Sequence, residues 1–260
     1  MISFYLPLCY TFNSRLNSFK EVFSWLFEFV FPLLLFAYLK YHIFDILLFI
    51  LSLLYVYNIY EIGYIENDTE TIKNENNPTM RLSGQELNYY NSHRSLIYLS
   101  RIVWIIVLAF FIYNSNDNYF IFYPLLLIPV FLTYNRIRNK WNIHLYLLQL
   151  FLRYSSILLL LTNMFDFNDL IYLFFMYPVM LYIYRSIIGR FGYINKFFKK
   201  YLIATKLEYP IFKLKYSFAI LIISVVFLLC VNSCYVYTIL SIYYFIYWSI
   251  RYYIKNSLKS

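Results

Sequence analysis

Carboxylate side chains are concentrated in one short segment of this chain. Of its 13 Asp and Glu residues, six fall within residues 61–86. If this segment continues a preceding helix, Asp68, Thr71 and Glu75 lie near one helix face, and Glu61 lies two turns earlier. Carboxylates that converge at a membrane surface repel one another, so they favour a bound cation. Hard oxygen ligands favour Mg²⁺, which commonly takes its other ligands from water and substrate phosphates.

Arg81 follows these carboxylates closely in the sequence. Together with the basic residues after it, it could complete a phosphate-binding site, because guanidinium groups match the geometry of phosphate oxygens. A second interpretation needs no ligand: the segment is a solvated polar loop whose charges keep it out of the bilayer. The residue types alone leave both interpretations open.

The same stretch resembles the first aspartate-rich motif of the UbiA-type intramembrane prenyltransferases, which is written N-D-x-x-D-x-x-x-D and is often followed by Pro-Thr-x-Arg. Asn67, Asp68 and Glu75 match its first, second and last places. Thr71 occupies the third acidic place, with Glu70 beside it. The tail of the motif is matched by Pro-Thr-Met-Arg at 78–81.

The resemblance implies transfer of a group from a diphosphate donor to an acceptor inside the bilayer, with magnesium neutralising the diphosphate as it leaves. It implies that Asp68, Glu70 and Glu75 hold Mg²⁺ and that Asn67 orients the cluster. It also implies contacts with substrate from the following residues: Glu61, Arg81, Lys199 and Lys200.

The second motif of the family belongs between the sixth and seventh helices, in the other long loop of this chain. Residues 190–215 contain one acid, Glu208, and six lysines. Among the superfamily, the polyprenyl-phosphate phosphoribosyltransferases have a basic second motif, to which Lys199 and Lys200 with Glu208 are loosely similar. The group transferred could therefore be prenyl or phosphoribosyl, and the acceptor a lipid or an aromatic compound.

Apolar segments must position these residues. Hydrophobic residues make up 62% of the 260 residues and charged residues 13%, which excludes an ordinary soluble domain and a disordered chain. The apolar runs approach the roughly 20 residues of a membrane helix and lack the alternation of membrane strands. We predict an all-α polytopic membrane helix bundle that forms a single integral membrane domain over 1–260. Its eight predicted transmembrane helices are 22–39, 43–60, 95–113, 119–134, 143–163, 169–184, 214–231 and 235–250.

Basic residues fix the predicted orientation. All 22 Lys and Arg residues except Lys40, Arg101 and Arg153 fall on alternate loops and on both tails. The positive-inside rule then places both termini in the cytoplasm, in a multi-pass protein of the inner (cytoplasmic) membrane. The net charge of +9 is explained by this topology, so we expect the lipid bilayer and a polyprenyl or other diphosphate or lipid-linked substrate as partners, and no nucleic acid.

The two long cytoplasmic loops are predicted at 61–94 and 185–213, and they contain all four glycines. Gly63-Tyr-Ile recurs as Gly192-Tyr-Ile, each just after an even-numbered helix. This favours a diverged duplication of a four-helix unit, with chance similarity in a Tyr- and Ile-rich chain as the alternative.

Glu28 and Arg153 are two of the charged residues that lie within predicted membrane helices. Glu28 is in the first helix and Arg153 is in the fifth, so each should face the protein interior, because a charge exposed to lipid costs a few kcal/mol. An ion pair between them is the structural interpretation. Arg153 as a ligand of a substrate phosphate is the functional one.

A UbiA-like membrane transferase is the leading functional prediction from the sequence. The first alternative is a non-catalytic protein with the same fold that binds lipid or serves as a scaffold subunit. The second is a transporter of lipid-linked glycans, for which ionisable residues are expected along a path at the membrane midplane.

Overall fold

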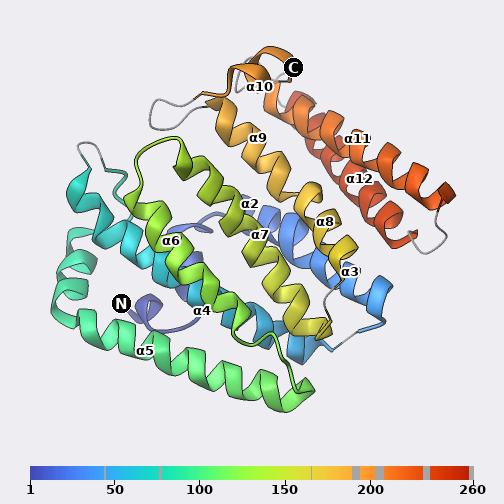
Figure 1. Ribbon diagram of the computed structural model, residues 1–260. Helices are drawn as coiled ribbons and strands as arrows, with labels where there is room; N and C mark the ends of the chain where they lie inside the picture. Colours follow the sequence, from blue (N-terminus) through green and yellow to red (C-terminus); the bar gives the residue numbers. More distant parts are fainter. Residues whose placement is uncertain are drawn as a thin grey trace. The chain divides into compact units, whose positions relative to one another are not determined.

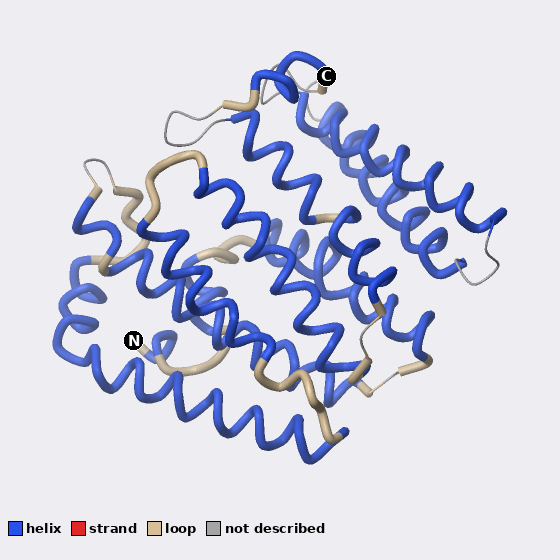
Figure 2. The backbone as a smooth tube through the Cα atoms, in the orientation of Figure 1, coloured by secondary structure: helices blue, strands red, loops and turns tan. Residues whose placement is uncertain are grey.

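The computed structural model describes residues 1–43, 45–75, 78–164, 166–188, 194–202, 208–230 and 235–257. Within these ranges every regular element is helical, as Figures 1 and 2 show. The predicted all-α class is therefore confirmed.

Six of the described helical segments are long and apolar enough to cross a membrane. The chain is thus a polytopic helical protein that contacts the lipid bilayer. The six segments correspond to the first, second, third, fifth, sixth and seventh predicted helices, and they are Phe19–Tyr41, Ile46–Asn74, Gly84–Ser115, Trp141–Thr162, Phe167–Ile188 and Tyr209–Cys230.

The other two predicted membrane helices are different. The fourth becomes a 3-10 turn, Tyr123–Leu126, followed by the ten-residue helix α6, Leu127–Arg136, which alone is too short to span a bilayer. The eighth is α12, Tyr235–Ser257, which has 23 residues but is rich in Tyr and less apolar. A total of eight membrane helices therefore stays a prediction.

Contacts within the chain divide it into two compact units, each described here by itself. Unit 1 comprises Met1–Ala37, His42–Ile137 and Leu152–Phe165. Unit 2 comprises Tyr38–Tyr41, Arg138–Phe151 and Asp166–Ser260.

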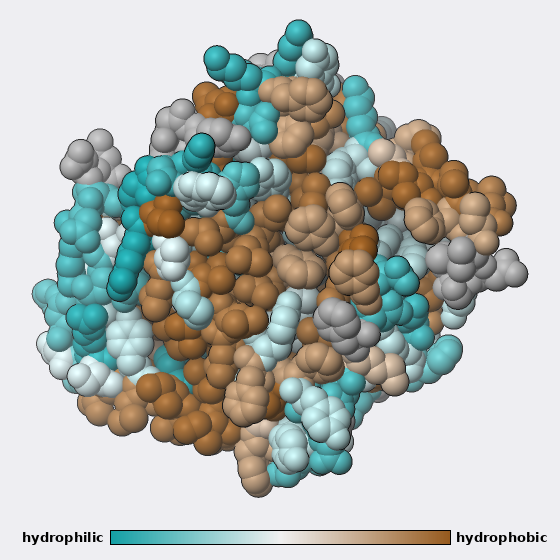
Figure 3. Space-filling view, viewed as in Figure 1, coloured by the Kyte–Doolittle hydropathy of each residue, from teal (hydrophilic) through white to brown (hydrophobic). Residues whose placement is uncertain are grey.

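Helix α4, Ile46–Thr69, is the centre of unit 1 and packs against α5, Gly84–Asn116, and against α6. The carboxylate of Asp45 caps α4 by accepting a hydrogen bond from Leu48 N at 2.9 Å. Ser83 begins α5 with a reciprocal capping box. Figure 3 shows hydrophobic side chains gathered along α5, where Ile106 and Phe110 are among the most exposed, as expected for a face that meets lipid.

Gly63 allows α4 and α6 to approach closely. A Cβ atom at this position would lie 2.2 Å from Cγ of Phe131 on α6. Asn135, one turn further along α6, donates a hydrogen bond to the carbonyl oxygen of Gly63 at 2.9 Å. The glycine therefore serves helix packing in unit 1. The matching Gly192 and Tyr193 lie outside the described residues, so the duplication stays a prediction.

The N-terminal segment folds onto unit 1 as a 3-10 turn, Ile2–Phe4, and the short helix α1, Cys9–Ser14. The side chains of Phe4 and Tyr10 are completely buried. Between these two elements Leu8 has a φ of 69°, a left-handed conformation that only strong surrounding contacts hold in a non-glycine residue. The segment is thus part of the core of unit 1.

Unit 2 consists mainly of helices from the second half of the chain. They are α8, Phe167–Met176; α9, Pro178–Ile188; α10, Lys196–Tyr201; α11, Tyr209–Cys230; and α12. Helices α11 and α12 lie side by side (Figure 1). The end of α3, Phe31–Tyr41, also belongs to this unit.

Most of the described residues in both predicted long loops are helical. The segment predicted as a loop at 61–94 begins inside α4, continues as a 3-10 turn, Thr71–Asn74, and ends inside α5. The segment at 185–213 includes the end of α9, all of α10 and the start of α11. Polar residues marked these segments as leaving the bilayer, but polarity does not end a helix whose backbone hydrogen bonds are internal.

Candidate functional site

Asp68 lies at the end of α4 with its side chain completely buried. Its Oδ2 accepts a hydrogen bond from the hydroxyl of Tyr10 at 2.9 Å. Its Oδ1 lies 2.8 Å from Nη2 of Arg15 and 3.2 Å from Nη1 of Arg81, and it also accepts from Nδ2 of Asn67 at 3.0 Å. Two guanidinium groups share one carboxylate, so this cluster carries one excess positive charge.

Tyr10 stays protonated in this cluster. Burial and the neighbouring Asp68 carboxylate both raise the pKa of the Tyr10 hydroxyl above its ordinary value. The hydroxyl therefore remains a hydrogen-bond donor to Asp68 at physiological pH.

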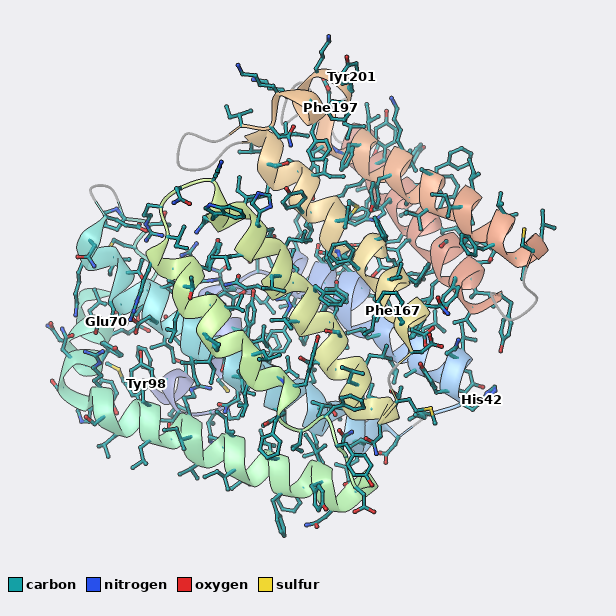
Figure 4. The ribbon with its side chains drawn as sticks, in the orientation of Figure 1. His42, Glu70, Tyr98, Phe167, Phe197 and Tyr201 are labelled. Atoms are coloured by element: carbon teal, nitrogen blue, oxygen red, sulfur yellow. The ribbon has the colours of Figure 1, made fainter. Side chains whose placement is uncertain are left out.

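Glu70 is also paired with cations. Its carboxylate lies 2.9 Å from Nζ of Lys73 and 3.4 Å from Nη1 of Arg94, and it accepts a hydrogen bond from the hydroxyl of Tyr90 at 3.0 Å. Figure 4 labels Glu70 in unit 1 together with Tyr98, whose hydroxyl contacts that of Tyr90. Glu70 thus ties the end of α4 to the first turns of α5.

The expected helix face of Asp68, Thr71 and Glu75 is not present. Helix α4 ends at Thr69, Thr71 begins a 3-10 turn, and Glu75 follows with extended backbone angles, φ −103° and ψ 133°. A 3-10 turn has about three residues per turn, so the helical spacing on which the prediction depended is lost there.

The described carboxylates do not fit a Mg²⁺ ion in this arrangement. Mg²⁺ needs oxygen ligands that are not already neutralised, whereas Asp68 and Glu70 are each bound by two cationic side chains. In the part of the chain that the structure describes, no three His, Cys, Asp or Glu side chains lie close enough together to hold a metal ion. Magnesium therefore stays an expectation from the resemblance.

Glu61, predicted to contact substrate, is a structural anchor. Its carboxylate is fully buried and lies 2.6 Å from Nη1 of Arg101 on α5. It also accepts backbone hydrogen bonds from Leu8 at 3.0 Å and Thr11 at 2.6 Å. All of these donors come from α5 or from the N-terminal segment, so Glu61 joins that segment to α4.

Arg101 completes this anchor. Its guanidinium donates to Oδ1 of Asn58 at 3.0 Å and to three backbone carbonyls of the N-terminal segment, those of Ser3, Phe4 and Leu6. The sequence marked Arg101 only as an exception to the charge pattern. In the sequence, Arg101 is a basic residue within an apolar run. This pattern predicts that its side chain lies in the protein interior, but it does not predict which residue pairs with it.

Arg153 on α7, Trp141–Thr162, lies among aromatic rings. Its guanidinium carbon is 4.7 Å from the ring centre of Phe29, 5.0 Å from that of Tyr60 and 5.8 Å from that of Tyr57. Its Nε is buried and has no hydrogen-bond partner. Arg153 is not among the described residues that form salt bridges.

The predicted ion pair between Glu28 and Arg153 is therefore absent. Glu28 is buried in a π-turn, Leu26–Val30, and its backbone carbonyl accepts a hydrogen bond from the hydroxyl of Tyr154 at 3.1 Å. Cation–π contacts, each worth about 0.5–2 kcal/mol, take the place of the carboxylate around Arg153.

One face of α4 links these two cationic centres. Tyr57, Tyr60, Tyr64 and Asp68 recur at helical spacing and form what we call the α4 stripe. The rings of Tyr60 and Tyr64 are 4.9 Å apart, and Arg15 lies 4.4 Å above the ring of Tyr64. Arg153 contacts the stripe at Tyr60, about 12 Å along the helix from Asp68 at 1.5 Å per residue.

Lys199 and Lys200 lie in the last turn of α10, with exposed side chains. They belong to unit 2, whereas Asp68 and Arg81 belong to unit 1. Their convergence on the carboxylates therefore stays a prediction.

Comparisons of the chain with protein-family models, with curated proteins and with solved structures find no match. Membership of the UbiA superfamily therefore stays a prediction from the sequence.

Proposed function

We propose that unit 1 binds the phosphate or diphosphate end of a polyprenyl-type lipid along the α4 stripe, and that the chain is a membrane transferase moving a prenyl or phosphoribosyl group there. The observation that carries the proposal is the guanidinium of Arg153, which is partly buried with its Nε fully enclosed, lies over three aromatic rings and forms no salt bridge with a described carboxylate.

A partly buried cation without a counter-ion is costly, and cation–π contacts offset only part of that cost. A phosphate oxygen would supply both the missing charge and an acceptor for Nε of Arg153. Charged hydrogen bonds of this kind contribute about 1.5–3 kcal/mol. The surrounding rings of Phe29, Tyr57 and Tyr60 suit the isoprenoid chain that such a phosphate would bring with it.

The Asp68 cluster supports a second phosphate contact at the other end of the stripe. Its one excess positive charge sits on Arg15 and Arg81, whose side chains are 16% and 35% exposed, while Asp68 is fully enclosed. A leaving diphosphate could be stabilised there by guanidinium groups that are already held in position by Asp68. The carboxylate then serves to orient the two arginines.

The test compares Arg153→Gln with Arg136→Gln, since Arg136 is an exposed arginine in the last turn of α6 in the same unit. Binding of a polyprenyl phosphate to the full chain in nanodiscs should weaken about tenfold or more in the first variant and stay unchanged in the second. The uncharged polyprenol should bind both equally. Equal affinity of the two variants for the phosphate would overturn the proposal.

Transfer is tested separately from binding. Membranes containing the full chain are supplied with radiolabelled prenyl diphosphate or phosphoribosyl diphosphate, and labelled lipid is measured. We expect product from the wild-type chain and a loss in Arg153→Gln.

The saturation of Asp68 and Glu70 by cations favours one other function, a non-catalytic lipid-binding protein of the same fold. Phosphate-dependent binding with no product from either donor would select that alternative.

A further inference from the structure

Unit 2 contains a cavity of about 640 Å³ that the proposed function does not use. Its walls are apolar and come from α8 and α11, with Ile171 and Phe175 on one side and Ile220, Ile223 and Phe227 on the other. Its volume is in the range of small-molecule sites.

Polar side chains gather at one end of this cavity. Nζ of Lys40 lies 3.5 Å from Oδ2 of Asp166 and 3.3 Å from Oδ1 of Asp169. Asp169 is buried and also accepts hydrogen bonds from the hydroxyls of Tyr41 and Tyr237, so each of its two oxygens already has a partner. Asp166 is 35% exposed and lines the cavity.

The charges at this end do not balance. One lysine faces two carboxylates, which leaves one excess negative charge. The helix termini do not change this sum, because α3 ends at Tyr41 with a partial negative charge while α8 begins after Asp166 with a partial positive one. Since Asp169 is enclosed, the excess charge is accessible only at Asp166.

We infer that this cavity binds a phospholipid with a primary amine in its headgroup. The ammonium group would donate hydrogen bonds to Asp166, while the adjacent phosphate would lie beside Lys40. One acyl chain would occupy the apolar part of the cavity. A trimethylammonium headgroup has no N–H donor, and an anionic headgroup without an amine meets the excess negative charge, so both fit this end less well.

The lipid reaches the cavity from the bilayer. The wall residues Ile223 and Phe227 are 53% and 57% exposed, on a helix apolar enough to span a membrane. Exposed apolar side chains on such a helix face lipid tails, so an acyl chain enters without crossing water.

The test uses the full chain in nanodiscs that contain equal amounts of phosphatidylethanolamine, phosphatidylcholine and phosphatidylglycerol with identical acyl chains. Lipids that remain bound after release into the gas phase are counted by native mass spectrometry. We expect the ethanolamine lipid to be enriched about fivefold over each of the others. Equal retention of the three, or preference for phosphatidylglycerol, would overturn the inference.

Asp166→Asn is the informative variant, because Oδ1 of Asp166 caps α8 by accepting from Asn168 N at 2.8 Å, and asparagine also caps helices well. The substitution removes the charge and should abolish the enrichment without changing the thermal midpoint. Asp45→Asn is the control, since Asp45 caps α4 in the same way in unit 1. An enrichment that survives in Asp166→Asn would also overturn the inference. Arg153→Gln should leave the enrichment unchanged, which separates this site from the proposed function.

Discussion

The carboxylate of Glu61 and the guanidinium of Arg101 form a buried salt bridge of 2.6 Å, with both side chains fully inaccessible to solvent. Within the described residues, the hydrogen-bond partners of Glu61 come from α5 and the N-terminal segment. A buried pair of this kind contributes little net stability, but the loss of one partner leaves an uncompensated charge in the interior. The pair therefore decides whether the N-terminal segment stays docked on unit 1.

Substitution Glu61→Leu should lower the free energy of unfolding by about 3–5 kcal/mol, because Arg101 would lose its counter-ion. The N-terminal segment should become a site of rapid proteolysis. Limited proteolysis and chemical unfolding in detergent micelles measure both effects. Arg136→Gln, at an exposed position of the same unit, should change neither, and a protected N-terminus in Glu61→Leu would contradict the anchoring role.

Substitution Gly63→Ala should destabilise unit 1 by about 1–3 kcal/mol, because the added Cβ would lie 2.2 Å from the Phe131 ring and force it to move. Gly84→Ala is the matched control, since nothing lies within 4 Å of a Cβ there. Combining Gly63→Ala with Phe131→Leu should recover part of the loss in a double-mutant cycle of unfolding free energies. If the two substitutions changed the unfolding free energy in a strictly additive way, the close approach of Gly63 and Phe131 would not be the cause of the destabilisation.

Substitution Asp68→Asn distinguishes a guanidinium site from a magnesium site. In the proposed site it raises the net positive charge of the cluster by one unit, so affinity for a polyprenyl phosphate should be kept or increased up to severalfold, with or without EDTA. A site that depends on Mg²⁺ would instead lose affinity in the variant and in EDTA. Glu75→Gln, beyond the end of the 3-10 turn, should leave binding unchanged.

The hydrogen bond from Tyr10 to Asp68 predicts a pH dependence. Because the folded-state pKa of Tyr10 lies above its ordinary value of 10.0, this group contributes stability that is fully present below about pH 10 and is lost as the pH rises above it. Tyr10→Phe should cost about 1–3 kcal/mol at pH 8 and should reduce the difference in unfolding free energy between pH 8 and pH 11. The other tyrosines titrate in both the wild-type chain and Tyr10→Phe. The difference between the two chains in the pH dependence of the unfolding free energy therefore reports on Tyr10 alone.

Most membrane helices could be predicted from the sequence, because long apolar runs are a strong local signal. The position of Asp68 near Arg81 was also predictable, since both lie in one polar stretch. The partners of Glu61 and Arg153 were not, because they come from segments far apart in the chain. Arg153 was expected to meet the single acid of the first helix, yet in a chain with 32 Tyr and 27 Phe residues, aromatic rings surround it instead. The composition shows that many aromatic rings are available to contact Arg153, but it does not show which of them do so.

The anchor at Glu61 has a consequence for biogenesis. Glu61 leaves the ribosome 40 residues ahead of Arg101, whereas the backbone amides of Leu8 and Thr11 have already been synthesised. During translation, the amides of Leu8 and Thr11 can therefore shield this carboxylate first, and the counter-ion arrives only when the next span is inserted. The weaker partners of Glu61, two backbone amides, are thus available before its strongest partner, the guanidinium of Arg101.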